Sequence, residues 1–101
     1  MSGLTTHVLD AVRGCGAAGM RVRLKRGEDV LADVRLDETG RARLAETLEA
    51  GAYELLFHAG DYQDAKFFDV IPVRFQVVDA AEHYHVPLIL SAFGYSTYRG
   101  G

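Results

Sequence analysis

Met20-Arg21-Val22-Arg23-Leu24-Lys25 is the stretch that decides the fold, because apolar and basic residues alternate through it without interruption. Successive side chains of a β-strand point to opposite faces, so this pattern places all the apolar residues of the stretch on one face. Turn residues follow at 27–29, and residues 30–36 alternate again. The two runs predict a β-hairpin in which one face of each strand is buried.

Strand-forming patterns continue along the rest of the chain, with turn residues between them. The further candidate strands are residues 4–12, 53–58, 70–78, 83–91 and 95–99. Residues 41–50 form a polar stretch between two of these strands. Seven or eight short strands predict an all-β fold, an antiparallel two-sheet sandwich.

One short helix is expected over Asp61–Phe67. Asp61 can cap its first turn, and Tyr62, Ala65 and Lys66 fall at helical spacing. The chain of 101 residues is the length of a single domain, spanning residues 1–101. A domain of this size buries only roughly 60–65% of its unfolded surface, so association between subunits would add useful apolar burial.

Composition excludes several classes of protein. The formal net charge is −3, and the basic residues are scattered, so the clustered positive charge of a nucleic-acid-binding protein is absent. No apolar run approaches the ~18–20 residues that a membrane helix requires. Cys15 is the single cysteine, and residues 1–7 lack the pattern of a secretory signal. We therefore expect a soluble protein of the cytoplasm.

A glycine motif at residues 14–19 matches G-x-G-x-x-G, the pattern of a dinucleotide-binding loop. Such a site requires that the last glycine lead into a helix whose N-terminus faces the pyrophosphate. The β-alternating run at 20–25 follows instead. The glycines are therefore interpreted as a flexible loop between two strands.

Two histidines share a face of the candidate strand at 83–91. His83 and His85 are separated by one residue, so the period of two aims both rings to the same side. With a third ring such as His7 they could bind zinc, and without a metal an imidazole could act as an acid and base near neutral pH. The remaining alternative is a pair of partly exposed histidines without a chemical role.

Other polar residues are less specific. Arg41 follows the turn glycine Gly40, where its guanidinium could bind an anionic or carbonyl-rich ligand or could simply be solvated. Asp10 and Arg13 are expected to form a surface pair worth at most ~1 kcal/mol. The hydroxyl-rich tail, residues 95–101, is expected to dock on the body of the protein or on another subunit, since two exposed tyrosines are costly.

Three motifs stand out along the chain: Thr6-His7-Val8-Leu9-Asp10, His83-Tyr84-His85-Val86-Pro87-Leu88-Ile89-Leu90-Ser91 and Tyr95-Ser96-Thr97-Tyr98-Arg99-Gly100-Gly101. In sequence and in order they resemble those of the 5-hydroxyisourate hydrolases, the transthyretin-related proteins of urate breakdown. The similarity extends from about Leu4 to the last residue. Two departures stand out: Gly101 replaces the usual terminal serine, and Ala92 replaces the proline that usually follows the Leu-Ser pair.

This resemblance implies a transthyretin-like sandwich and a homotetramer, a dimer of dimers, with active sites in a channel between the dimers. It implies a small-molecule substrate, 5-hydroxyisourate, and a product of hydrolysis, 2-oxo-4-hydroxy-4-carboxy-5-ureidoimidazoline. No metal or other cofactor is implied. The family's catalytic residues match His7, Arg41 and His85, and its substrate-binding tyrosine matches Tyr98.

From these matches we expect Ser96 and Arg99 to contact substrate along with His7, Arg41 and Tyr98, and His83 to support the site from behind. One histidine, His85 or His7, would take a proton from water while Arg41 stabilises negative charge on the opening ring. Among these, His85 is the favoured base. The alternative is a non-catalytic, transthyretin-like protein that binds a small ligand.

Overall fold

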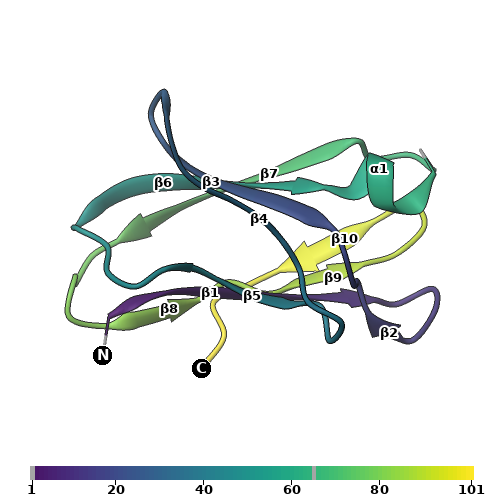
Figure 1. Ribbon diagram of the computed structural model, residues 1–101, viewed down its shortest axis with the longest axis horizontal. Coiled ribbons are helices and arrows are strands. Elements are labelled where there is room, and N and C mark those ends of the chain that lie inside the picture. Colours follow the sequence, from purple (N-terminus) through teal and green to yellow (C-terminus); the bar gives the residue numbers. More distant parts are fainter. Residues whose placement is uncertain (1, 65) are drawn as a thin grey trace.

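Two β-sheets face each other across one apolar core in the computed structural model, which describes residues 2–64 and 66–101 (Figure 1). The six-stranded sheet contains β1 (Gly3–Asp10), β2 (Cys15–Gly16), β5 (Arg41–Ala45), β8 (His83–His85), β9 (Leu88–Leu90) and β10 (Tyr95–Thr97). The four-stranded sheet has the order β4 (Asp29–Arg35), β3 (Arg21–Arg26), β6 (Gly51–His58) and β7 (Val70–Val77). The expected all-β, two-sheet sandwich with one short helix is confirmed.

The hairpin of the alternating stretch forms as predicted. β3 and β4 pair antiparallel, and the apolar residues Met20, Val22 and Leu24 are at most 1% exposed. β6 lies on the other side of β3 and contributes Leu55 and Phe57 to the same core. Burial of one face of each strand therefore sets the register of this sheet.

β1 is the centre of the opposite sheet. β5 and β8 both pair with Thr5, so they lie on opposite edges of β1. β8 and β9 run parallel to β1, although the sequence predicts antiparallel strands throughout. More than 70 residues separate β1 from β8, so no hairpin imposes an antiparallel arrangement on this pair.

Strand boundaries differ from the predicted ones in two places. The stretch predicted as a polar connection begins with β5, in which Ala42 and Leu44 face the core while the arginines on either side of Ala42 point outward. The candidate strand 83–91 is divided into β8 and β9 around Pro87, which has no N–H to donate to a ladder. Both differences increase the number of short strands.

The helix is shorter and earlier than predicted. α1 spans Ala59–Gln63, and His58 stands at its N-cap position without a side-chain hydrogen bond. Asp61 lies within the first turn instead of capping it, and Asp64 ends the helix in a left-handed conformation with φ of 56°. Ala65, which belonged to the predicted helical spacing, lies outside the described residues.

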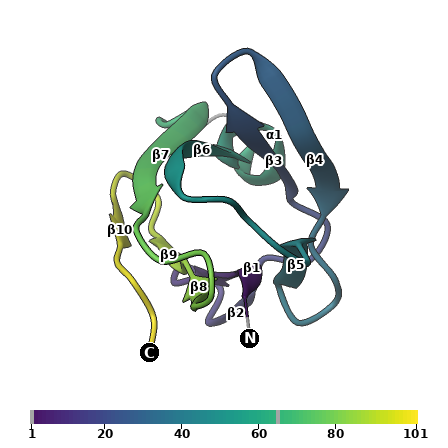
Figure 2. The same ribbon diagram turned by 90° about the vertical axis from the view of Figure 1, so that its left-hand side faces the viewer.

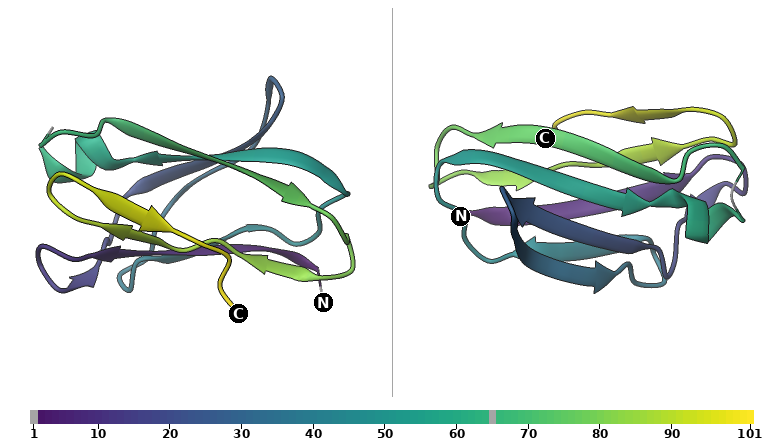
Figure 3. Two further views of the ribbon diagram at one scale, coloured as in Figure 1. Left: turned by 180° about the vertical axis from the view of Figure 1, so that it is seen from behind. Right: turned by 90° about the horizontal axis from the view of Figure 1, so that it is seen from above.

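The sandwich has two open sides, and the C-terminal segment lies outside one of its sheets. Viewed end on, β7 and β10 border one side of the sandwich and β4 and β5 border the other (Figure 2). The C-terminal segment leaves β10 and ends on the outer side of the six-stranded sheet (Figure 3). In residues 2–64 and 66–101, no helix is long and apolar enough to cross a membrane.

Candidate active site

The outer face of the six-stranded sheet brings together three side chains from three strands. In β1 the residues Leu4, Thr6 and Val8 face the core, so Thr5 and His7 point outward. The register pairs His7 with Arg41 of β5 and pairs Thr5 with His85 of β8. Residues paired across a ladder share a face of the sheet, which places His7, Arg41 and His85 side by side.

A surface pocket of about 370 Å³ opens on this face. Arg41 and His85 both line it, together with Thr5, Asp37 and Arg43. His7 lies beside it in the ladder, where it pairs with Arg41. The pocket therefore has a cationic and imidazole-rich wall of the kind that can bind a carbonyl-rich, electron-poor ligand.

Arg41 is held by the turn that precedes it. One carboxylate oxygen of Asp37 accepts hydrogen bonds from the Thr39 amide, the Thr39 hydroxyl and the Arg41 amide, at 2.8, 2.6 and 3.0 Å. Gly40 has φ of 80°, and a Cβ there would lie 2.7 Å from the Val8 carbonyl oxygen. Within the described residues the Arg41 guanidinium has no hydrogen-bond partner, so its five N–H donors remain available.

His85 is half-buried between β1, the Arg41 guanidinium and the tail. Burial lowers the pKa of its imidazole, and the positive charge of the Arg41 guanidinium lowers this pKa further. The Gly100 amide donates to the His85 carbonyl oxygen at 2.7 Å, and a Cβ at Gly100 would lie 2.5 Å from His85 Cδ2. The tail is therefore packed against the His85 ring, which stays neutral at pH 7.

Within residues 2–64 and 66–101, the His7 side chain makes one hydrogen bond. Its Nε2 lies 3.2 Å from the Thr39 carbonyl oxygen, which can only accept a hydrogen bond. Nε2 therefore carries the hydrogen in this contact, and the Nδ1 lone pair of the neutral ring is left for another partner. His7 is thus tied to the same turn that positions Arg41.

His83 lies on the same face as His85, as the spacing predicts. The Thr5 hydroxyl oxygen lies 2.9 Å from His83 Nε2 and 2.9 Å from His85 Nδ1. Thr5 was not singled out by the sequence interpretation, although the alternation of β1 places it on the face of His7. Among residues 2–64 and 66–101 there is no cluster of three or more His, Cys, Asp or Glu side chains that could hold a metal ion, so the geometry does not support the three-histidine zinc site.

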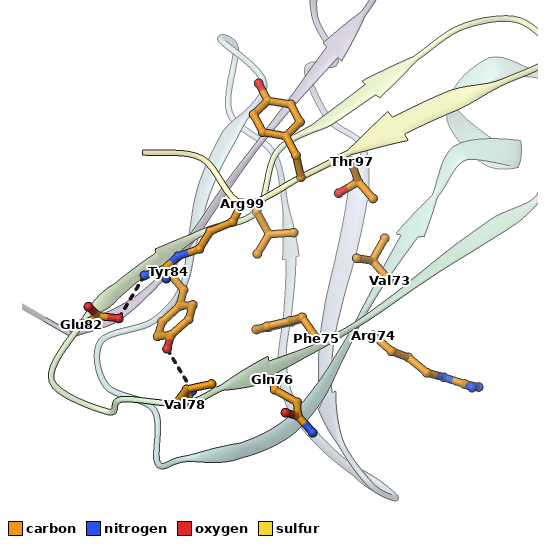
Figure 4. Close-up of a pocket in the computed structure, with 11 residues that line it drawn as sticks. Val73, Arg74, Phe75, Gln76, Val78, Glu82, Tyr84, Thr97 and Arg99 are labelled. Carbon is orange, nitrogen blue, oxygen red and sulfur yellow. Dashed lines mark hydrogen bonds and ion pairs between the residues drawn. The ribbon is translucent and has the colours of Figure 1, made fainter.

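The expected contact of Arg99 with substrate is not supported by its position. Arg99 projects into a second pocket, between β7 and β10, of about 540 Å³ (Figure 4). There its guanidinium pairs with Glu82 at 3.3 Å and lies 4.2 Å from the centre of the Tyr84 ring. These contacts anchor the tail and direct the charge away from His85.

The two other expected tail residues occupy different surroundings. Ser96 pairs with Ile89, which pairs in turn with Leu9, so Ser96 lies on the outer face of the sheet with His7. Tyr98 is 55% exposed and lines the pocket between β7 and β10. Within one chain, Ser96 therefore shares the face of the cluster, whereas Tyr98 borders the second pocket.

Asp10 is a buried carboxylate, and the expected surface pair with Arg13 is wrong. Asp10 is 2% exposed, and it accepts hydrogen bonds from the Val12 and Arg13 amides and from the Tyr62 hydroxyl, at 3.0, 3.0 and 2.7 Å. Burial raises the pKa of this carboxyl, but the Tyr62 hydroxyl and the two amides outweigh it, and the net pKa lies below the ordinary value. Asp10 therefore ties β1 to the helix.

The glycine motif has a structural purpose instead of the predicted flexibility. Gly16 belongs to β2, and a Cβ on it would collide with the Thr39 backbone, while Gly14 and Gly19 have φ of 73° and 82°. β3 follows, as the sequence predicts, so the loop leads into a strand and not into a helix. Close packing of Gly16 on Thr39 supports the turn that carries Arg41.

Comparisons with known proteins agree with this geometry. The model of the HIUase/transthyretin family matches residues 4–100. A 5-hydroxyisourate hydrolase of Caulobacter vibrioides is 47% identical, with 99% of each chain covered. The solved 5-hydroxyisourate hydrolase of Klebsiella pneumoniae has a TM-score of 0.92 at 33% identity, with all of both chains covered. Sea bream transthyretin in complex with thyroxine has a TM-score of 0.87 at 27% identity, with 97% of this chain and 94% of that chain covered.

Proposed function

The chain belongs to the HIUase/transthyretin family, and on that premise we propose that it hydrolyses 5-hydroxyisourate at the cluster of His7, Arg41 and His85. The product is 2-oxo-4-hydroxy-4-carboxy-5-ureidoimidazoline, an intermediate of urate breakdown. The observation that carries the proposal is the half-buried, neutral His85 in one pocket with the Arg41 guanidinium, which has no partner in the part of the chain that the structure describes.

The reaction opens the six-membered ring of the substrate. The oxygen of water forms a bond to a ring carbonyl carbon, and the bond from that carbon to the ring nitrogen breaks, which leaves a carboxylate and a ureido group. The step requires a base for the water proton, donors for the oxyanion that develops on the carbonyl, and a proton for the leaving nitrogen.

His85 is assigned as the base. Burial and the neighbouring Arg41 guanidinium keep its pKa low, so the ring has a free lone pair at neutral pH. The proton that it takes from water can then be returned to the leaving nitrogen. General base catalysis of this kind contributes typically ~10²–10⁴-fold.

Arg41 and His7 complete the site. Arg41 presents paired N–H donors to the developing oxyanion, and removal of such a donor costs typically ~10²–10³-fold in turnover. His7 lies opposite Arg41 in the ladder and uses its free Nδ1 to orient the water and contact the substrate. The scheme requires no metal ion, and metal analysis of active protein tests that part of it.

The tail supplies the remaining contacts. Ser96 lies on the face of the cluster, and Tyr98 is exposed enough to reach a ligand on this chain or on another subunit. Arg99 keeps the tail in place through Glu82 and Tyr84 instead of binding substrate. The Gly100 amide then fixes the end of the chain against His85.

A homotetramer, arranged as a dimer of dimers, belongs to the same proposal. The pocket of Arg41 and His85 lies on an outer sheet face of a single chain, where water reaches the substrate from the open side. A second subunit packed over this face would exclude bulk water and strengthen the electrostatic contacts. Sedimentation and cross-linking test the assembly, and cell fractionation tests the expected cytoplasmic location.

A transthyretin-like ligand carrier is the alternative function. The Caulobacter vibrioides hydrolase is more similar to this chain than sea bream transthyretin is, at 47% against 27% identity. The sequence motifs that resemble the hydrolases contain His7 and His85, and Arg41 matches the family's arginine after the turn glycine. We therefore favour catalysis over binding alone.

The decay of 5-hydroxyisourate distinguishes the two. The substrate is generated from urate in situ, and its ultraviolet absorbance is followed with and without the protein. Catalysis predicts a decay rate that rises in proportion to protein concentration, with many substrate molecules converted per subunit. A carrier would leave the decay unchanged or slow it by sequestering one ligand per site, and that result would overturn the proposed function.

A further inference from the structure

One threonine hydroxyl connects the two histidines of β8. Thr5 Oγ1 lies 2.9 Å from His83 Nε2 and 2.9 Å from His85 Nδ1. A hydroxyl carries one hydrogen and two lone pairs, so Thr5 can donate to only one of the two rings and can accept from the other. The direction of this short chain decides which nitrogen of His85 carries a proton.

The direction follows from the other end of the chain. His83 Nδ1 lies 3.4 Å from the Ser2 carbonyl oxygen, which has no hydrogen to give. His83 Nδ1 is therefore the donor, and Nε2 of the neutral ring has the lone pair that accepts the Thr5 hydrogen. The Thr5 oxygen then accepts from His85 Nδ1–H, and Nε2 of neutral His85 is left unprotonated.

We propose that Thr5 and His83 are positioning residues that hold neutral His85 in its Nδ1–H tautomer, so that Nε2 takes the proton from water. The role of His85 as base rests on the proposed function, whereas the tautomer is a property of the folded protein. The Nδ1–H bond to Thr5 also persists after Nε2 has been protonated, so the same contact stabilises the imidazolium.

A neutral hydroxyl suits this position better than a carboxylate. The charged and titratable groups that face His85 are Arg41 from β5, His7 from β1 and its neighbour His83. The carboxylate that lines the pocket, Asp37, accepts the hydrogen bonds of its own turn. A carboxylate in direct contact with His85 Nδ1 would favour the imidazolium, whereas Thr5 orients the ring without adding negative charge.

Variants at Thr5 separate orientation from packing. Thr5→Val keeps the shape of the side chain and removes the hydroxyl, and we expect kcat to fall about 10–100-fold at little change in KM. Thr5→Ser keeps the hydroxyl and restores kcat. Thr47→Val makes the same chemical change at an exposed threonine outside the pocket and leaves both constants unchanged.

Variants at His83 test the far end of the chain. His83→Phe removes the acceptor for the Thr5 hydrogen and is expected to lower kcat in the same range. The amide oxygen of His83→Gln can accept that hydrogen, so this variant retains most of the activity. Circular dichroism and thermal unfolding confirm that each variant is folded.

Nitrogen-15 NMR of histidine-labelled protein reads the tautomer without any substrate. The chain has four histidines, and single variants assign their signals. At a pH where His85 is neutral, we expect Nδ1 protonated and Nε2 unprotonated in the wild type, and a mixture of tautomers in Thr5→Val. A wild-type Nε2–H tautomer, or unchanged tautomer and kcat in both Thr5→Val and His83→Phe, would overturn the inference. Absence of turnover in the wild type would instead overturn the proposed function.

Discussion

Tyr62→Phe is expected to destabilise the protein, because it removes one hydrogen bond to a buried carboxylate and leaves the ring in place. The hydroxyl of Tyr62 donates to Asp10 Oδ2 at 2.7 Å, while the other carboxylate oxygen is used by two backbone amides. A hydrogen bond to a charged group contributes about 1.5–3 kcal/mol. Taking about 2 kcal/mol, the expected loss in Tm is roughly 8–16 °C for a domain of this size.

The pH dependence of this effect has a definite sign. The ordinary pKa of an aspartate is 3.8, and that of Asp10 lies below it in the folded protein. The stability that comes from its charged form is therefore complete above the unfolded pKa and is lost as pH falls through the folded pKa. The difference in Tm between the wild type and Tyr62→Phe should be constant from neutral pH down to about pH 5 and shrink below about pH 4.

Two further tyrosines provide the matched controls. Tyr95→Phe removes a hydroxyl that has no hydrogen-bond partner among the described residues and should leave Tm unchanged. Tyr53→Phe removes a bond of 2.7 Å to a neutral carbonyl and should cost about 1 kcal/mol. All proteins are compared at one subunit concentration, since association shifts Tm. A Tm of Tyr62→Phe equal to that of Tyr95→Phe at pH 7 would refute the reasoning.

Two more predictions concern the site and its support. Burial and Arg41 lower the pKa of His85, so the apparent pKa of the acid limb in the pH profile of kcat/KM should lie below the ordinary histidine value of 6.5. Arg41→Gln should move this limb to higher pH in the activity that remains. A limb that does not move would contradict the coupling between Arg41 and His85. Gly16→Ala places a methyl group against the Thr39 backbone and should lower the free energy of unfolding by about 1–3 kcal/mol. Cys15→Ala, at the exposed neighbouring residue, should change it little. Equal Tm values for the two variants in thermal unfolding would refute the packing argument.

The alternation of apolar and polar residues along the strands predicts most of the fold. The pattern at residues 20–25 defines which face of β3 is buried, and the same rule places His83 and His85 on one face. The same alternation predicts that Thr5 shares the face of His7. The sequence interpretation considered the histidines and did not consider this threonine. The motifs of the family then identified His7 and His85, and the turn glycine Gly40 identified Arg41, which the sheet brings side by side with them.

Contacts between distant segments account for the differences. The Tyr62 hydroxyl that bonds Asp10 is 52 residues away, so no residue near Asp10 in sequence indicates this partner for its carboxylate. β5 alternates as well, but its inward residue Ala42 is too small to stand out against the arginines beside it. Arg99 belongs to a family motif, which indicates its presence and not the direction of its side chain. Glu82 and Tyr84 bind the Arg99 guanidinium on the side away from His85.

The turnover of 5-hydroxyisourate by His85→Gln, measured beside His58→Gln, tests the central claim most directly. His58 is a buried histidine that accepts a hydrogen bond from Arg23 at 3.0 Å in the other sheet, and glutamine can accept the same bond. The account predicts that kcat/KM falls about 10²–10⁴-fold in His85→Gln and stays within about twofold of the wild type in His58→Gln. Equal turnover by the two variants would show that the active centre lies elsewhere.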